Sequence, residues 1–161
     1  QAMGQDVVCS DYRLLQQLNL FEAAVTEAQR LRPVVGLLSF TPTSETVIDN
    51  VALPSDCIAY FVSRPSMTDA KNFSNPQQYD PYRWLAREDG FTHEARAFLQ
   101  FGAGPRLCPG RHLAGVQIRL VLSTILKSFR MELACEPESI EEVSAFTMRP
   151  SHMPVRLSLR H

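Results

Sequence analysis

The pattern of apolar positions predicts helical structure near the start of the chain. From Asp11 to Arg32 apolar residues recur at helical spacing in two pieces. The second piece runs from Leu20 to Leu31. Asn19 stands before it as an N-cap with Glu22 three residues later, the arrangement of a capping box. Pro33 ends the helix, because proline disfavours helical geometry in the preceding residue.

Three short runs rich in β-branched and aromatic residues follow this helix. They cover Val34 to Thr41, Thr46 to Leu53 and Cys57 to Val62, and they predict a small antiparallel sheet. Asp49-Asn50 is a turn signal inside the second run. From Ser63 to Gln100 the chain has little periodicity and several prolines, which predicts a long ordered coil with one short helix. Coils of this length in compact domains usually serve a function.

The strongest helical segment runs from Gly110 to Phe129. Apolar residues lie around most of its circumference, so we expect this helix to be buried. They are Leu113, Val116, Ile118, Leu120, Val121, Leu122 and Ile125. The tail from Phe146 to Leu159 alternates loosely around a turn between Pro150 and Pro154, which predicts a closing hairpin.

Composition is that of an ordinary globular protein. The 161 residues are 45% hydrophobic and 20% charged, and we expect one domain over residues 1–161. The formal net charge of −1 gives no reason to expect a nucleic-acid partner. Polar residues interrupt the apolar stretch around Leu113 to Phe129, so we expect no transmembrane segment.

The four cysteines, at positions 9, 57, 108 and 135, form no regular pattern. Without a CxxC pair or a histidine at ligand spacing, a zinc site is not expected. A disulfide framework is also unexpected in a chain of this size, so we predict a reducing, cytoplasmic location. A single cysteine in isolation is more often a buried, inert thiol than a ligand.

Cys108 is not isolated, because it stands in the segment Phe101-Gly102-Ala103-Gly104-Pro105-Arg106-Leu107-Cys108-Pro109-Gly110. This segment resembles the heme-binding loop of the cytochromes P-450 at every fixed position: Phe, two residues, Gly, one, Arg, one, Cys, one, Gly. A random window would match on the order of once in ten million. The resemblance implies that the chain binds heme b (iron protoporphyrin IX) and that Cys108 is the ligand and catalytic thiolate of the iron.

The chemistry of a heme-thiolate site explains this spacing. Free amides at the start of the helix near Gly110 would stabilise an anionic sulfur on Cys108. Gly102 and Gly104 permit a tight turn, and Gly110 lets the helix start pack beside the ring. The resemblance gives the other two positions their roles: Arg106 would bind a heme propionate, and Phe101 would cover the sulfur.

Two further motifs resemble the same family. Glu27-Ala28-Gln29-Arg30 matches its Glu-x-x-Arg helix motif, and Pro81-Tyr82-Arg83-Trp84 matches its Pro-x-Arg-aromatic element. A spacing of three places Glu27 and Arg30 on one helix face. In the family the second arginine joins this pair in a buried network, so Glu27, Arg30 and Arg83 are predicted to be structural.

The resemblance implies an α+β fold, the mainly helical C-terminal part of the cytochrome P-450 fold with small antiparallel sheets and a long coil. The chain is expected to be truncated, lacking the central helix that crosses the distal heme face. Some positions depart from the family. Leu38-Ser39-Phe40 replaces a propionate-binding arginine, Ala114-Gly115-Val116-Gln117 replaces Ala-x-x-Glu, and Ser63 to Asp69 distorts an Arg-Asp-Pro turn. Arg64, His93 and His112 are candidates to bind the heme propionates in place of that arginine. The favoured interpretation is that all three are ordinary exposed polar side chains.

Three functional hypotheses remain open. The first is a heme-thiolate oxidoreductase of monooxygenase lineage, with peroxide as one candidate oxidant. The second is a non-catalytic heme-binding module such as a sensor, carrier or store, and the third is a scaffold protein that has kept the fold. A half-fold would expose apolar surface, so we expect self-association or a partner chain over the distal face, and a redox partner for the first hypothesis.

Overall fold

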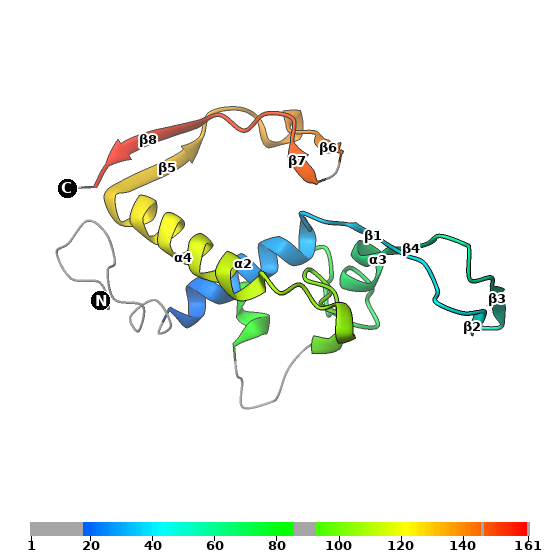
Figure 1. The fold of residues 1–161 in the computed structure, drawn as a ribbon. Coiled ribbons are helices and arrows are strands. Elements are labelled where there is room, and N and C mark those ends of the chain that lie inside the picture. Colours follow the sequence, from blue (N-terminus) through cyan, green and yellow to red (C-terminus); the bar gives the residue numbers. More distant parts are fainter. Residues whose placement is uncertain (1–17, 86–92, 146, 161) are drawn as a thin grey trace.

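A computed structural model describes residues 18–85, 93–145 and 147–160. The first helical piece predicted from Asp11 lies largely outside these residues. Helix α2 (Asn19–Leu31) crosses the middle of the molecule, and helix α4 (Arg111–Ser128) lies beside it (Figure 1). Within the described residues, the strands pair as four two-stranded antiparallel ladders. This confirms the expected α+β class.

Helix α2 ends as predicted but begins differently. Arg32 N–H donates to the Ala28 carbonyl at 2.8 Å, which closes the last turn before Pro33. At the other end Leu18 occupies the cap position, and no side chain caps the helix. The predicted capping box is therefore wrong, because Asn19 lies inside the first turn, where its side chain cannot act as the cap.

The strand-like runs form two separate ladders rather than one sheet. Strand β1 (Leu37–Phe40) pairs antiparallel with β4 (Ala59–Val62), and β2 (Thr46–Ile48) pairs with β3 (Val51–Leu53). The predicted turn is confirmed, because Asp49 and Asn50 have φ angles of 46° and 65°. Two positive φ angles in a two-residue loop match the twist of a hairpin. The β2–β3 hairpin projects from the body (Figure 1).

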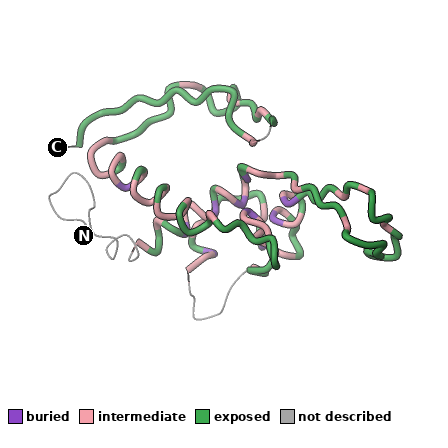
Figure 2. Tube along the Cα trace, in the orientation of Figure 1, coloured by how far each residue is buried: buried purple, intermediate pink, exposed green. Residues whose placement is uncertain are grey.

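The long coil contains the expected short helix, α3 (Ser63–Met67). Three 3-10 turns follow it: η1 (Pro81–Trp84), η2 (Ala95–Ala97) and η3 (Gly104–Arg106). The coil packs against α2 chiefly through η1. The buried side chains gather at this contact (Figure 2).

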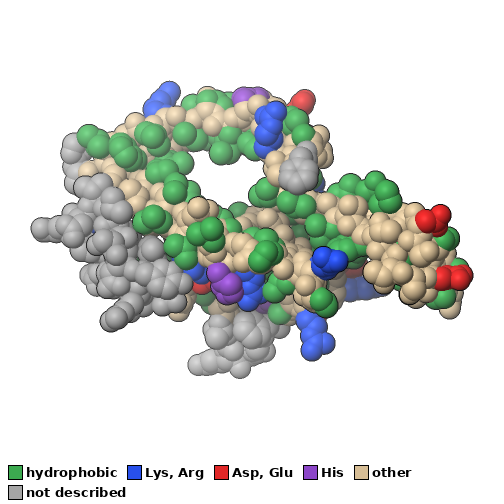
Figure 3. Space-filling model, in the orientation of Figure 1, with side chains coloured by type: hydrophobic (Ala, Val, Ile, Leu, Met, Phe, Trp, Pro, Cys, Tyr) green, Lys and Arg blue, Asp and Glu red, His purple; other side chains and the backbone are tan. Residues whose placement is uncertain are grey.

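Helix α4 is confirmed almost to the residue, but its predicted burial is wrong. Ser123 is its one buried residue, whereas Leu113 and Val121 are 63% and 54% exposed. The helix is apolar around most of its circumference, yet the described elements cover only part of it. Hydrophobic side chains of α4 and of the C-terminal strands therefore border an open space (Figure 3).

The predicted hairpin within Phe146 to Leu159 is also wrong. Strand β7 (Met148–Pro150) pairs with β6 (Glu142–Ser144), and β8 (Val155–Leu159) pairs with β5 (Phe129–Leu133). A short 3-10 turn, η4 (Pro137–Ser139), precedes β6. The alternating residues of the tail do form strands, but each strand pairs with one that precedes it in the sequence. No helix in the described part of the chain is long and apolar enough to cross a membrane.

Candidate functional site

The cysteine loop is a series of tight turns that ends at helix α4. Cys108 N–H donates to the Phe101 carbonyl at 2.9 Å, and Leu107 N–H donates to the Gly104 carbonyl at 3.1 Å. These bonds fold the loop back so that Cys108 lies near Phe101. Gly110 caps α4, so the sulfur-bearing residue stands two positions before the cap.

Two glycines of the loop have backbone conformations that side chains disfavour. Gly102 has a φ of +74° and Gly104 a φ of +63°. Gly110 has an ordinary φ of −81°, and a Cβ there would lie 3.7 Å from the Cys108 Sγ. The sequence prediction of a glycine-dependent turn therefore holds for Gly102 and Gly104, while Gly110 leaves space beside the sulfur.

Cys108 borders a cavity of about 450 Å³. The loop supplies one wall, the segment through β1 supplies the second, and the first turns of α4 supply the third. Apolar side chains dominate these walls, among them Val34, Leu38, Phe101 and Ile118. Among the described residues that line this cavity, Arg106 is the charged one. The arrangement offers a thiol, a guanidinium and flat apolar surfaces to a single ligand.

The side chains of this loop lie open to the solvent. Cys108 and Arg106 are exposed, and Phe101 is half-buried. The shielding of the sulfur that was expected from Phe101 is therefore incomplete in the protein as it stands. Arg106 has no ion pair among the described residues, so its guanidinium is available to an anionic group. The chemistry of this donor set fits an iron porphyrin with carboxylate substituents.

Behind the loop, the carboxylate of Glu27 joins three elements in one buried network. Arg30 donates to it from Nε at 2.8 Å and Nη2 at 2.9 Å, and Arg83 donates from Nε at 3.0 Å. Glu27 and Arg30 are fully buried, and Arg83 is 1% exposed. The three residues that the sequence motifs singled out thus meet in space.

The network includes partners that the motifs did not identify. Trp84 Nε1 donates to Glu27 Oε2 at 2.9 Å, and the Asp80 amide donates to Oε1 at 3.0 Å. Burial alone would raise the pKa of Glu27, but the hydrogen bonds from Arg30, Asp80 and Trp84 outweigh burial and lower it. The carboxylate therefore stays ionised between its arginines. The adjacency of Trp84 to Arg83 was the only sequence signal for its role.

An aromatic cluster packs against this network. The ring of Phe73 stacks on His93 with centroids 5.7 Å apart, and Trp84 contacts both His93 at 4.5 Å and Phe98 at 5.1 Å. The Arg30 guanidinium lies 5.0 Å from the Phe73 ring centroid. Burial, together with the positive charge of Arg83, lowers the pKa of His93. This cluster links the charged network to the chain that leads into the cysteine loop.

The three residues considered as alternative partners for the heme propionates, Arg64, His93 and His112, have different environments. Arg64 forms a bidentate ion pair with Glu142 at 2.7 and 2.8 Å and also donates to the Leu31 carbonyl. His93 is packed among aromatic rings, so the favoured interpretation of an exposed polar side chain is wrong for this residue. His112 is exposed, as that interpretation expects. None of the three lines the cavity beside Cys108.

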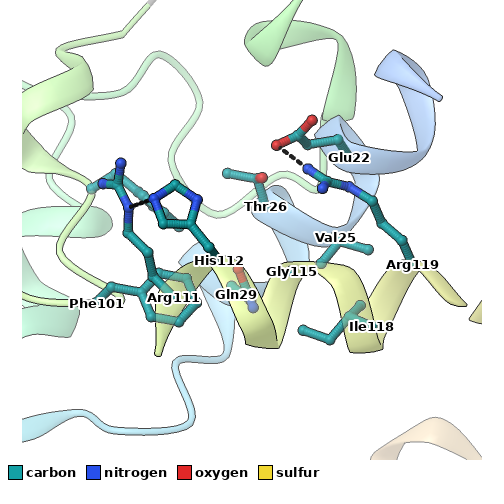
Figure 4. A pocket seen from close by; sticks show the side chains of 11 residues that line it. Glu22, Val25, Thr26, Gln29, Phe101, Arg111, His112, Gly115, Ile118 and Arg119 are labelled. Atoms are coloured by element: carbon teal, nitrogen blue, oxygen red, sulfur yellow. Dashed lines mark hydrogen bonds and ion pairs between the residues drawn. The ribbon is translucent and has the colours of Figure 1, made fainter. Parts of the chain in front are cut away.

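A second, smaller cavity of about 260 Å³ lies between α2 and α4 (Figure 4). Arg111 donates to the ring of His112 at one end of this cavity, and Glu22 forms an ion pair with Arg119 at 2.5 Å at the other end (Figure 4). This cavity shares part of its lining with the one beside Cys108, because Gln29, Phe101 and Ile118 line both. No sequence pattern predicted this cavity, because it depends on how the two helices cross.

Comparison with known proteins gives a consistent result. The family profile described as Cytochrome P450 matches residues 1–156. Cytochrome P450 11B2, mitochondrial, of Mesocricetus auratus is 34% identical over 154 residues. The cholesterol side-chain cleavage enzyme, mitochondrial, of Ovis aries is 33% identical over 121 residues. These matches cover 96% and 75% of this chain but only 30% and 23% of the two relatives.

Solved structures show the same fold. The heme domain of cytochrome P450DA superposes with a TM-score of 0.83 at 21% identity, covering 95% of this chain and 34% of that one. A retinoic acid-bound cyanobacterial CYP120A1 gives a TM-score of 0.84 at 19% identity, covering 98% and 36%. The chain thus spans about a third of the length of the proteins it matches.

Proposed function

Because this chain belongs to the cytochrome P450 family, we propose that it binds heme b and that the thiolate of Cys108 is the protein ligand of the iron. The observation that carries the proposal is the position of this cysteine at the wall of a 450 Å³ cavity, beside Arg106, which has no ion pair within the part of the chain that the structure describes. The function that follows is that of a heme-thiolate oxidoreductase of monooxygenase lineage.

The residues around the cavity suit the two kinds of surface that a porphyrin presents. Val34, Leu38 and Ile118 offer apolar contacts to the macrocycle. Arg106 offers a charge-assisted hydrogen bond to a propionate. The positive φ angles of Gly102 and Gly104 keep the loop folded close beneath this space. These residues would hold the group, and the network around Glu27 would hold the loop.

A bound heme with a thiolate ligand would supply oxidation chemistry at the iron, which the electron-rich sulfur favours. The residues of this chain contribute binding and orientation. The described side chains leave the face of α4 and the surface around it open, so little in the described chain selects a substrate. Turnover driven by peroxide, with poor selectivity, is the form of activity that this openness favours.

The alternative is a non-catalytic heme-binding module, such as a sensor, carrier or store, or a scaffold protein that has kept the fold. The open cavity beside Cys108 is the observation that favours this alternative. Both oxidoreductase and module require the same heme ligand, whereas the scaffold does not.

The deciding experiment is a titration of the purified chain with hemin, followed by reduction and exposure to CO. We expect a thiolate-type absorption spectrum in the wild type and its loss in Cys108→Ala. Cys57→Ala is the matched control, because Cys57 lies in the β3–β4 connection, away from the cavity. A hemin-saturated wild type without a thiolate-type spectrum would refute the proposal. So would an unchanged spectrum in Cys108→Ala.

A second measurement separates the enzyme from the module. Peroxide-dependent oxidation of a generic substrate by the hemin-loaded protein, absent in Cys108→Ala, indicates an oxidoreductase. A thiolate spectrum without such oxidation indicates a sensor, carrier or store.

The partner predictions belong to the same proposal. Exposed apolar residues on α4 and on the C-terminal strands support self-association or a partner chain over the open face. A strictly monomeric holoprotein in sizing measurements would contradict this. A redox partner is proposed for the oxidoreductase only. The two named relatives are mitochondrial proteins, and a cytoplasmic location for this chain stays a prediction.

A further inference from the structure

The cavity between α2 and α4 carries more positive than negative charge on its described lining (Figure 4). Arg111 and Arg119 line it, and Glu22 is the acidic residue beside them. Glu22 already forms an ion pair with Arg119, so the charge of Arg111 is left over. We propose that this cavity binds a phosphate group, either the free ion or a small phosphate monoester, and that Arg111 recognises its charge. Cys108 does not line this cavity, so the site is separate from heme binding.

Arg111 keeps most of its donors for a ligand. Its Nε donates to His112 Nε2 at 3.3 Å, which leaves both terminal nitrogens of the guanidinium without a partner among the described residues. No carboxylate in the described part of the chain lies within ion-pair distance of it. A guanidinium with two unused terminal nitrogens suits phosphate, because it can donate parallel hydrogen bonds to two of the oxygens.

His112 adds a donor next to this guanidinium. Because Nε2 of its ring accepts from Arg111, the neutral ring carries its proton on Nδ1. Nδ1 makes no hydrogen bond with another described residue. In the view of Figure 4 the ring of His112 stands between Arg111 and Thr26. An anion between the helices can therefore accept from this ring as well as from the guanidinium.

Helix α2 supplies two uncharged donors from the other wall. Thr26 and Gln29 are three residues apart on this helix, so their side chains leave it on the same face. Both side chains line the cavity and are half-buried, and neither makes a hydrogen bond within the described part of the chain. A hydroxyl and an amide without protein partners can each donate to a bound oxyanion. The two helices thus present donors from two sides.

The size of the cavity and the arrangement of its donors favour phosphate over a carboxylate. At about 260 Å³ the cavity lies below the usual volume of small-molecule sites, roughly 300 to 1,000 Å³, so it suits a small group. A phosphate monoester carries roughly −1.5 to −2 charges at neutral pH and three acceptor oxygens. A tetrahedral group can accept from both helices at once, whereas a planar carboxylate offers two oxygens in one plane.

The test is a titration of inorganic phosphate with the purified full chain, followed by phosphorus NMR at an ionic strength held constant with chloride. We expect the phosphate signal to shift and broaden until the site is saturated. Arg111→Gln should weaken binding about tenfold, and Thr26→Val, which removes only a hydroxyl, about threefold. Arg111 is exposed, so its replacement does not threaten the fold. Arg96→Gln is the matched control, because Arg96 is also an exposed arginine but lies outside the cavity.

Two further variants test the charge and the location. Glu22→Gln releases Arg119 and removes the negative charge from the lining, so phosphate should bind about threefold more tightly. Arg106→Gln alters the cavity beside Cys108 and should leave phosphate binding unchanged.

A second titration, with glycerol phosphate, distinguishes the two sources of the group. Tighter binding of the ester than of the ion identifies a phosphorylated metabolite as the ligand, and the reverse order identifies free phosphate.

Three results would overturn the proposal: a phosphate signal that the chain leaves unchanged, equal affinity of the wild type and Arg111→Gln, or a loss in Arg106→Gln that Arg111→Gln does not show. The titration is repeated with Cys108→Ala, which removes the proposed heme ligand. Phosphate binding that persists there separates this inference from the heme proposal, whichever of the two fails.

Discussion

Glu27 is the residue whose removal should damage this protein most. Its carboxylate receives hydrogen bonds from Arg30, Arg83, Trp84 and the amide of Asp80, at distances from 2.8 to 3.0 Å. Glu27→Ala leaves two buried guanidinium groups without their counter-charge. Breaking a buried ion pair from one side costs roughly 3–5 kcal/mol.

That loss is a large part of the stability of an ordinary domain, which is about 5–15 kcal/mol. It acts on the contact that joins α2, η1 and the coil leading to the cysteine loop. We therefore expect Glu27→Ala to abolish heme incorporation as well as to lower the free energy of unfolding. Arg30→Ala should have the same effect, since it leaves Glu27 with one guanidinium instead of two.

Helix α2 supplies its own control. Glu22 also pairs with an arginine, Arg119, but its side chain is 55% exposed. A surface pair of this kind contributes about 1 kcal/mol or less. Glu22→Ala and Glu27→Ala thus make the same chemical change on one helix, the first at an exposed ion pair and the second in a buried network.

Urea unfolding followed by circular dichroism measures the stability, and the absorbance of bound hemin measures incorporation. Glu27→Gln keeps an acceptor oxygen and the side-chain volume, so it should fall between the two alanine variants. It also keeps the comparison measurable if Glu27→Ala does not fold. Equal losses for Glu22→Ala and Glu27→Gln, or full hemin binding by Glu27→Ala, would refute the reasoning.

Three other outcomes follow from the structure. The lowered pKa of Glu27 contributes stability that is present above the ordinary glutamate pKa and is lost as the pH falls through the pKa of the folded state. Glu27→Gln should therefore flatten the acid limb of the pH–stability curve. Because the pKa of His93 is lowered in the folded state, the unfolded chain binds a proton first as the pH falls. The free energy of unfolding should therefore fall as the pH drops through the ordinary histidine pKa. His93→Phe should remove that dependence. Gly102→Ala should cost about 1 kcal/mol because of its φ of +74°, whereas Gly115→Ala, inside α4, should stabilise by roughly 1 kcal/mol in the same urea assay; a reversed order would contradict the turn geometry.

The sequence determined the features that depend on local chemistry. Pro33 stops α2, Asp49-Asn50 turns the β2–β3 hairpin, and the apolar run after Gly110 forms α4. Each rests on the conformational preference of a few adjacent residues. The cysteine loop and the two arginine motifs could also be recognised from the sequence, because their spacing and order are specific enough to identify the family.

Tertiary structure decided what depends on contacts between distant segments. The tail strands paired with β5 and β6 instead of each other, because strand pairing is chosen among all available edges and leaves no mark in a local pattern. Asn19 is not the N-cap of α2, because the helix begins at Asn19 itself, one residue earlier than the capping-box pattern predicts.

The burial of side chains was likewise invisible to periodicity. An apolar helix predicts that something covers it, but only the three-dimensional structure shows that the described elements leave α4 largely open. The same holds for Trp84 in the Glu27 network and for the cavity between α2 and α4. Their partners lie dozens of residues away along the chain, and only folding determines which of these groups meet.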